Sequence, residues 1–207
     1  MNKLATILTA SVALTALAAD AKLTPTELQQ GRLYLEQTRD LAIGATKGLS
    51  EAQWNFKPAP DRWSIAEIVE HMVLTQNFAL GPIRAQLAQA PKAQERDAKQ
   101  VDSLLLAKFP DRLQKFNAPD VLKPTGRWTP AESLERLLGN TTKLEEYLES
   151  TPDLRQHTIE GAPLKALSQG KYDQMDGYQW ILATAAHTER HVKQILEVKA
   201  DPNFPMK

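Results

Sequence analysis

Two of the four histidines in the sequence stand four residues apart, in the segment His187-Thr188-Glu189-Arg190-His191. Four residues of an α-helix turn by about 400°, so both imidazoles project from one face within reach of a single metal ion. His71 lies in another helical stretch, on a face that borders apolar residues. Because helix bundles place metal ligands on facing helices, His71 is the predicted third ligand beside His187 and His191.

The same histidines also have a plainer interpretation. A pair spaced by four residues can lie on a solvated helix face, and a single histidine beside apolar residues is often a hydrogen-bonded core residue. His157, which lies in a long connection without a helical partner, is expected at the surface. If three neutral histidines do bind a divalent transition metal, with zinc or nickel expected, coordination positions stay open for a water, thiol or carboxylate. Open positions are typical of catalytic sites.

Acidic residues near the histidines could take chemical roles. The zincin pattern H-E-x-x-H has its glutamate directly after the first histidine, whereas here Glu189 comes two residues after it, so this is not a zincin motif. Glu70 points about 100° away from its neighbour His71 on a helix, which favours an ion-pair or capping role. Glu67 lies one turn before His71 and is the candidate catalytic proton-transfer group. Its alternative role is as the capping-box partner of a serine three residues earlier.

Four stretches with helical periodicity must position these side chains. The segments between them are rich in Pro, Gly and Trp, which favours an all-α chain. Four amphipathic helices of this length predict an antiparallel four-helix bundle with long connections. The expected helices begin at the capping residue Thr24 and end near Leu49, run from Ser64 to about Leu80 where Gly81-Pro82 interrupts, run from Thr129 to near Ser150, and run from Gly177 to Lys199.

The connections differ in character. The aromatic loop from Ser50 to Trp63 is expected to pack over one end of the bundle, and the tryptophans are expected to pack in the core rather than to line a cleft. Residues 101–108 are a short helix or an extended piece. The long connection from Pro152 to Asp176 is expected to be a crossover between bundle helices.

The first residues predict export. Lys3 precedes the uncharged apolar run from Leu4 to Leu17, and small residues follow, so residues 1–21 are expected to be a signal peptide cleaved near Ala18 or Ala21. A membrane-spanning helix needs about 20 apolar residues, so this run is short for a stable membrane anchor. The mature chain, residues 22–207, is expected to be one domain that is periplasmic or secreted.

Composition excludes several partners and ligand types. With 25 basic and 25 acidic residues the chain has no electrostatic footprint for nucleic acid, so no nucleic-acid partner is expected. The chain contains no cysteine, so neither disulfide bonds nor thiolate ligands are available. Any metal must therefore be held by His, Asp or Glu.

Two separate motifs resemble those of the DinB/YfiT-like superfamily. The segment Trp54 to Glu67, followed by Glu70-His71, is similar to its N-terminal signature, and His187 to His191 with Gln194-Ile195 is similar to its last-helix motif. The resemblance covers nearly all of the mature chain and implies an up-down-down-up four-helix bundle, often a homodimer. It also implies a metal bound by one histidine of the second helix and two of the fourth, which here are His71, His187 and His191. Characterised relatives include thiol-dependent S-transferases and isomerases that use bacillithiol, mycothiol or glutathione.

Three functions remain open from the sequence. The first is a metal-dependent enzyme, a transferase or hydrolase, with a small-molecule substrate or a thiol as its partner, because a metal lowers the pKa of a bound water and holds a thiolate. The second is a metal- or ligand-binding protein without turnover. The third is a helical interaction module whose histidines are structural. The sequence does not choose between the first two.

Overall fold

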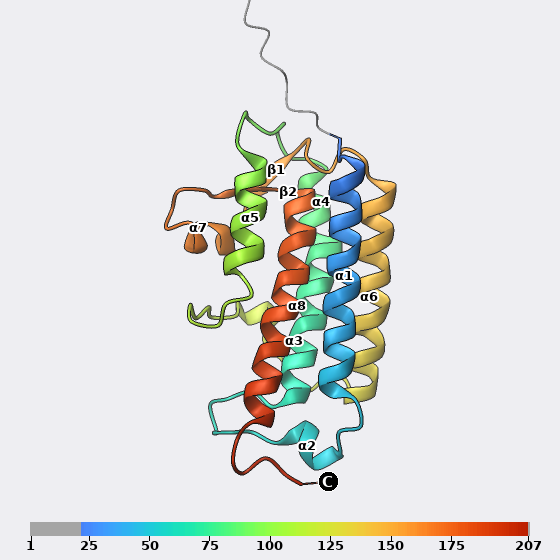
Figure 1. Cartoon of the computed structure of the whole chain (residues 1–207), viewed down its shortest axis with the longest axis vertical. Coiled ribbons are helices and arrows are strands. Elements are labelled where there is room, and N and C mark those ends of the chain that lie inside the picture. Colours follow the sequence, from blue (N-terminus) through green and yellow to red (C-terminus); the bar gives the residue numbers. More distant parts are fainter. Residues whose placement is uncertain (1–21, 207) are drawn as a thin grey trace, which may run out of the picture.

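Four long helices form the body of the molecule in the computed structural model, which describes residues 22–206 (Figure 1). The predicted signal peptide, residues 1–21, lies outside the described residues. The bundle helices are α1 (Pro25–Thr46), α3 (Ile65–Phe78), α6 (Pro130–Ser150) and α8 (Gly177–Lys199). The shorter elements are α2 (Glu51–Asn55), the π-helix η1 (Ala79–Ile83), α4 (Arg84–Leu87), α5 (Ala98–Lys108), the 3-10 helix η2 (Asp120–Leu122), α7 (Ala162–Leu167) and the strands β1 (Thr158–Glu160) and β2 (Gln174–Asp176).

Capping boxes define where the bundle helices begin. Thr24, Ser64 and Thr129 each accept a hydrogen bond from the backbone N–H three residues later, and the glutamate at that third position accepts from the capping residue's own N–H. These contacts satisfy backbone donors that have no partner inside the helix. The predicted starts of α1, α3 and α6 are thereby confirmed, and α8 begins in the same way at Asp176.

The four bundle helices surround one core in the order α1, α8, α3, α6. Helix α1 packs against α8 and α6, and α3 packs against both of them as well. Figure 1 shows that α1 and α8 run in one direction while α3 and α6 run in the other. Two neighbouring pairs, α1–α8 and α3–α6, are therefore parallel, so the predicted antiparallel arrangement holds only for α1–α6 and α3–α8. The up-down-down-up order that the family resemblance implied is observed.

Parallel neighbours require a connection that spans the length of the bundle, and residues 88–129 provide it. This segment returns from the end of α4 to the start of α6, with α5 running beside α8 (Figure 1). The predicted crossover at residues 152–176 is wrong, because that connection joins α6 to α8 at one end of the bundle. It folds into β1, α7 and β2, and its two strands pair antiparallel with Thr158 opposite Asp176. Strands of three residues are too short to show a sequence periodicity.

Gly81-Pro82 interrupts the regular α-helix, as expected, since α3 ends at Phe78, but the helical path does not stop there. The chain passes from α3 through the π-helix η1 and continues into α4 as far as Leu87. A proline inside an α-helix lacks the N–H needed for the regular hydrogen-bond pattern, and a π-helical turn changes that pattern locally. The helical path is therefore kept while Pro82 is accommodated.

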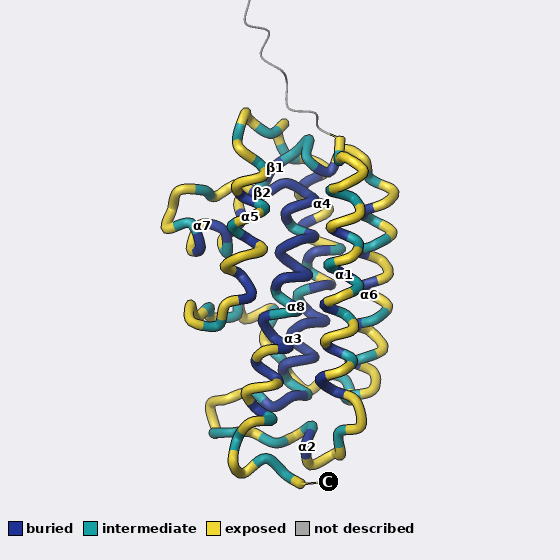
Figure 2. The backbone as a smooth tube through the Cα atoms, in the orientation of Figure 1, coloured by how far each residue is buried: buried dark blue, intermediate teal, exposed yellow. Residues whose placement is uncertain are grey.

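Tryptophans pack against the core rather than standing free. Trp54, Trp63 and Trp128 contact a buried cluster formed mainly by α3 and α8 together with α1, and Trp180 contacts a second cluster between α5, α7 and α8. Figure 2 shows buried residues concentrated on α3 and α8, while α1 and α6 carry more exposed positions. The expected packing role of the tryptophans and of the aromatic 50–63 loop is confirmed.

Buried charges fasten the end of the bundle where α1 and α8 begin. The guanidinium of Arg155 donates to Glu27 at 2.7 Å and to Asp176 at 3.0 Å, and it also pairs with Asp102 on α5. Arg96 donates to the same fully buried Asp176 at 2.6 Å. Removal of one partner from such a group leaves an uncompensated buried charge, which costs about 3–5 kcal/mol. The network therefore holds α1, α5 and the 151–176 connection against the start of α8.

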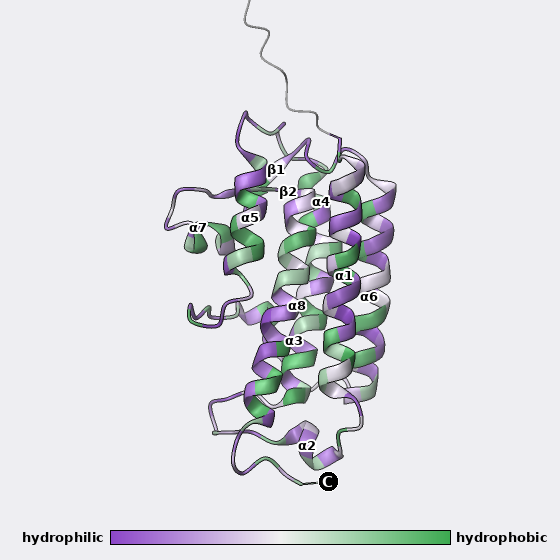
Figure 3. Ribbon diagram, in the orientation of Figure 1, coloured by the Kyte–Doolittle hydropathy of each residue, from purple (hydrophilic) through white to green (hydrophobic). Residues whose placement is uncertain are grey.

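Hydrophobic and hydrophilic residues form stripes along the bundle helices, as expected for amphipathic helices around one core (Figure 3). Between residues 22 and 206, no helix combines the length and the apolar character required to cross a lipid bilayer.

Two glycine substitutions test how tightly the start of α8 is packed. A Cβ at Gly177 would lie 2.7 Å from Cδ2 and 3.0 Å from the backbone oxygen of Leu154, whereas a Cβ at Gly139 on α6 meets no atom within 4 Å. Gly177→Ala should lower the free energy of unfolding by about 1–3 kcal/mol through overpacking. Gly139→Ala should raise it by about 0.5–1 kcal/mol through helix propensity. Urea denaturation followed by circular dichroism measures both, and equal effects would contradict the packing argument.

Candidate metal centre

The three predicted histidines meet at one point between two neighbouring bundle helices. His71 comes from α3, and His187 and His191 come from successive turns of α8. The Nε2 atom of His187 lies 3.1 Å from the Nε2 atom of His71 and 3.1 Å from that of His191. One nitrogen from each ring lies within 4.8 Å of the other two. Residues more than 100 positions apart in the chain are thus brought into one cluster.

Hydrogen bonds fix which nitrogen of two imidazoles carries the proton. The Nδ1 atom of His71 lies 2.7 Å from the backbone oxygen of Leu122, and that of His191 lies 2.8 Å from Oε1 of Gln194. The same Oε1 accepts from the Arg112 guanidinium, which can only donate, so this atom is assigned as the amide oxygen. Both partners are acceptors, so each Nδ1 must be the protonated donor. The Nε2 lone pairs of His71 and His191 therefore face the centre of the cluster.

Burial keeps these imidazoles neutral. Burial lowers the pKa of His71 below its usual value, despite the opposing hydrogen bond to Leu122. Burial, the repulsion that a protonated His187 would meet from protonated His191 or His71, and the nearby Arg190 guanidinium lower the pKa of His187 well below that value, and burial also strongly lowers the pKa of His191. Neutral histidine is the form that binds metal.

Aromatic rings enclose the cluster. The ring of Trp63 lies with its centroid 4.8 Å from that of His71 and 6.4 Å from that of His191, and the ring of Phe109 lies 6.0 Å from His187. His187 is the least buried of the three ligands. Apolar walls of this kind lower the local dielectric and restrict water. Access from solvent is therefore expected on the side of His187.

The donor set and its dimensions fit a divalent transition metal. Two nitrogens that bind one ion at about 2.0–2.1 Å cannot lie more than about 4.2 Å apart. The two separations that involve His187 are 3.1 Å, and the third pair lies within 4.8 Å. Within residues 22–206 the ligand group consists of the three histidines and includes no carboxylate. Three protein ligands leave further coordination positions for water or substrate, which is the arrangement of catalytic zinc sites rather than closed structural ones.

Glu67 is occupied by local contacts. Its carboxylate accepts from the backbone N–H of Ser64 at 2.8 Å, which completes the capping box, and it pairs with the ammonium of Lys57 at 2.8 Å. The contact with Ser64 is the capping-box role that the sequence offered as the alternative for Glu67. A catalytic role of Glu67 in proton transfer stays a prediction.

Glu70 points away from the histidines, as expected. Its carboxylate accepts from the backbone N–H groups of Thr125 at 3.0 Å and Gly126 at 2.8 Å, and it pairs with Arg127 at 3.2 Å. The carboxylate is almost fully buried. Glu70 therefore attaches the segment before α6 to α3, directly beside a ligand histidine.

His157 lies outside the cluster. Its Nδ1 atom is 2.7 Å from the backbone oxygen of Ala90, and the residue is partly buried rather than fully at the surface. An isolated β-bridge between His157 and Lys92 explains the additional burial. Among the described residues, the group of possible metal ligands is formed by the other three histidines.

The groups that orient two of the imidazoles have no role assigned from the sequence. Gln194 stands in the last-helix motif, and its role could have been inferred, because it lies three residues after His191 on the same helix and so shares its face. The backbone oxygen of Leu122 and the side chain of Arg112 could not, since both belong to the irregular segment between α5 and α6, which carries no periodic signal.

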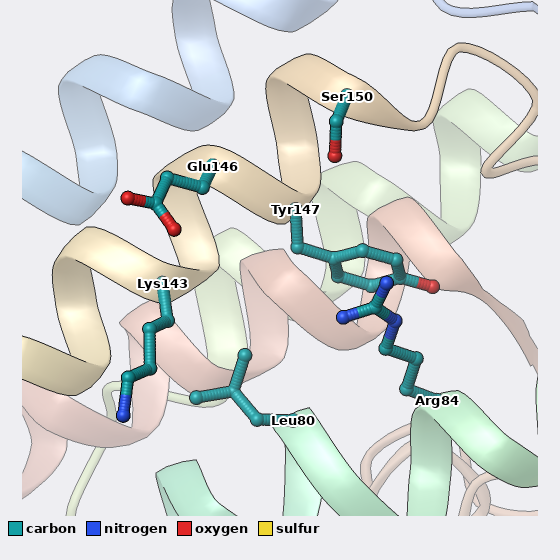
Figure 4. Close-up of a pocket in the computed structure, with 6 residues that line it drawn as sticks. All are labelled: Leu80, Arg84, Lys143, Glu146, Tyr147 and Ser150. Atoms are coloured by element: carbon teal, nitrogen blue, oxygen red, sulfur yellow. The ribbon is translucent and has the colours of Figure 1, made fainter.

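A separate surface groove of about 380 Å³ lies between α4 and α6 (Figure 4). It is lined by Leu80, Arg84, Lys143, Glu146, Tyr147 and Ser150, and it shares no residue with the histidine cluster. The Arg84 guanidinium lies 4.5 Å from the centroid of the Tyr147 ring, and Figure 4 shows Lys143 and Glu146 extending away from this pair. The charged groups of the groove do not converge, unlike the three imidazoles.

Comparisons with known proteins agree with the motifs. A family model described as the DinB superfamily matches residues 34–195. The uncharacterised protein YuaE of Bacillus subtilis (strain 168) is 26% identical over 153 residues, which is 74% of this chain and 87% of that protein. The structure of YfiT from Bacillus subtilis, reported as a probable metal-dependent hydrolase with an unusual four-helix bundle topology, superposes with a TM-score of 0.56. At 13% identity, over 86% of this chain and 88% of that one, YfiT shows the shared fold. The extent of the family match establishes that this chain belongs to the DinB superfamily.

Proposed function

We propose that this chain is an exported hydrolase that acts on a small molecule and depends on a divalent metal bound by His71, His187 and His191. One observation carries the proposal, namely that imidazole nitrogens from α3 and α8 converge at 3.1 Å with no carboxylate to complete the site in the described chain. The description of YfiT as a probable metal-dependent hydrolase supports the choice of reaction. Zinc or nickel is the proposed ion, because imidazole ligands suit both.

The residues of the site would divide the work. The three histidines hold the ion, while the Leu122 carbonyl and the Gln194 amide hold two of the rings in orientation. Trp63 covers the cluster from one side and limits access of bulk water. A divalent ion held in this way lowers the pKa of a bound water to about 7 and polarises a substrate carbonyl.

Metal content gives the first test. Purified wild-type protein should contain about one zinc, nickel or similar ion per chain, and the double variant His187→Ala/His191→Ala should contain none, because two of three ligands are lost. His157→Ala is the matched control and should keep the metal. Elemental analysis by mass spectrometry, with circular dichroism to verify the helical fold, measures the outcome. A double variant that retains its metal would refute the assignment.

The reaction class is tested on the metal-loaded protein. Hydrolysis of a panel of small esters and amides should require added metal and should fall to the metal-free rate in His71→Ala. Glu67→Gln should keep the metal, and its rate tests whether the Glu67 carboxylate transfers protons. Transfer of the acyl or alkyl group to a small thiol in place of water would identify an S-transferase instead. Absence of both reactions would leave a metal-binding protein without turnover.

Export has its own test. Intact-mass measurement of the protein from the periplasmic fraction or culture medium should show the loss of residues 1–18 or 1–21, because the apolar run from Leu4 to Leu17 is followed by small residues. Val12→Arg is the control, since a charge in the middle of that run should keep the chain uncleaved in the cytoplasm. An uncleaved wild-type chain found only in the cytoplasm would contradict export.

A further inference from the structure

Residues 109–127 lie in the connection between α5 and α6 and are here called the collar segment. This segment helps to orient two of the three histidines of the proposed metal site. It supplies the Leu122 oxygen that accepts from Nδ1 of His71. It also supplies Arg112, which donates to Gln194 Oε1 at 3.3 Å, and that oxygen accepts from Nδ1 of His191. The orientation of both rings therefore depends on residues of one irregular segment.

Helix α8 holds the collar segment through a buried arginine. Arg190 is 4% exposed, and its guanidinium donates to the backbone oxygens of Phe109, Asp111 and Gln114. The guanidinium also lies 5.0 Å from the centroid of the Phe116 ring. Among the described residues no carboxylate forms an ion pair with Arg190, so the collar carbonyls are what satisfies this buried charge. An undocked collar segment would leave the charge without partners, which is costly.

Further contacts attach the two ends of the collar segment. Near its start, the guanidinium of Arg112 is clamped by Glu197 of α8, with distances of 2.9 and 2.8 Å to the two carboxylate oxygens. Near its end, Glu70 of α3 accepts from the N–H groups of Thr125 and Gly126. The collar segment thus bridges α3 and α8, the same two helices that provide the metal ligands.

We propose that the collar segment is the outer coordination shell of the metal centre, that Arg112 and Gln194 are positioning residues for His191, and that Arg190 keeps this shell docked. The inference rests on the proposed metal binding and adds to it. Without the acceptors at Nδ1, either nitrogen of a neutral imidazole can carry the proton, and the Nε2 lone pairs are no longer aimed at the ion. Metal affinity and docking of the collar segment are therefore linked, and each strengthens the other.

Metal affinity of designed variants tests the link. Gln194→Leu removes the acceptor and should weaken zinc binding about 10–100-fold, as expected for loss of an outer-shell partner. Gln194→Glu keeps an acceptor oxygen and should restore most of the affinity. Arg190→Met should also weaken binding, although Arg190 is no ligand, whereas Arg84→Met in the groove beside α6 should not. Competition with a chromophoric chelator measures affinity, and the visible spectrum of the cobalt-substituted proteins reports ligand geometry.

Hydrogen exchange tests the reciprocal effect. Zinc should slow amide exchange of residues 109–127 in the wild-type protein, and this protection should be lost in Arg190→Met while the amides of α1 and α6 stay unchanged. A wild-type protein that binds no metal would refute the proposed function itself. If Gln194→Leu and Arg190→Met bind zinc as tightly as the wild type and give the same cobalt spectra, the inference about the collar segment is overturned while the proposed function stands. The same holds if zinc has no effect on amide exchange of residues 109–127.

Discussion

Three imidazole Nε2 atoms, at least two of them acceptors, are held in one small volume where α3 meets α8, and the arrangement around them follows from that constraint. Because Nδ1 carries the proton in His71 and His191, only His187 is free to place a proton on Nε2. At most one of the two 3.1 Å contacts can then be a hydrogen bond at a time. A buried acceptor without a donor costs about 1–3 kcal/mol, so the site is satisfied best by a cation. Burial keeps the imidazoles neutral and the ring orientation points Nε2 atoms at one place, and both features favour binding of a cation.

The bundle topology brings the three histidines together, and it also places another part of the chain over them. Helices α3 and α8 are antiparallel neighbours, so one turn of each faces the other at mid-length, whereas the parallel pair α3 and α6 forces the chain to return along the bundle. That return path contains α5 and the collar segment, which lies against both ligand-bearing helices. Away from the histidine site, the buried ion network around Arg155 fixes the start of α8. Helix α8 is therefore held at its start by this network and further along by the collar segment.

Local sequence signals predict part of the fold and part of the histidine site. Capping residues gave the starts of α1, α3 and α6, the spacing of four residues placed His187 and His191 on one face, and the aromatic loop was expected over a bundle end. The family resemblance implied the helix directions, but the path of the crossover depends on tertiary packing, which leaves no local signal in the sequence. The backbone oxygen of Leu122 is beyond prediction for a different reason, since every residue has a carbonyl and no side-chain pattern marks this one.

A purely structural histidine cluster would be arranged differently. Core histidines usually pair a donor nitrogen with an acceptor and an acceptor nitrogen with a donor, so that each ring is satisfied by the protein. Here the Nδ1 donors of His71 and His191 are satisfied by protein oxygens, while their two Nε2 acceptors share one partner, the Nε2 atom of His187, which can donate to only one of them at a time. A structural role would also not explain why the collar segment holds the Nδ1 donors of His71 and His191. The collar segment is itself kept in place by the buried charge of Arg190. A bound cation explains both features with one interaction, because it is a partner for both Nε2 lone pairs at once, and His187 can turn its own Nε2 lone pair to it by carrying its proton on Nδ1.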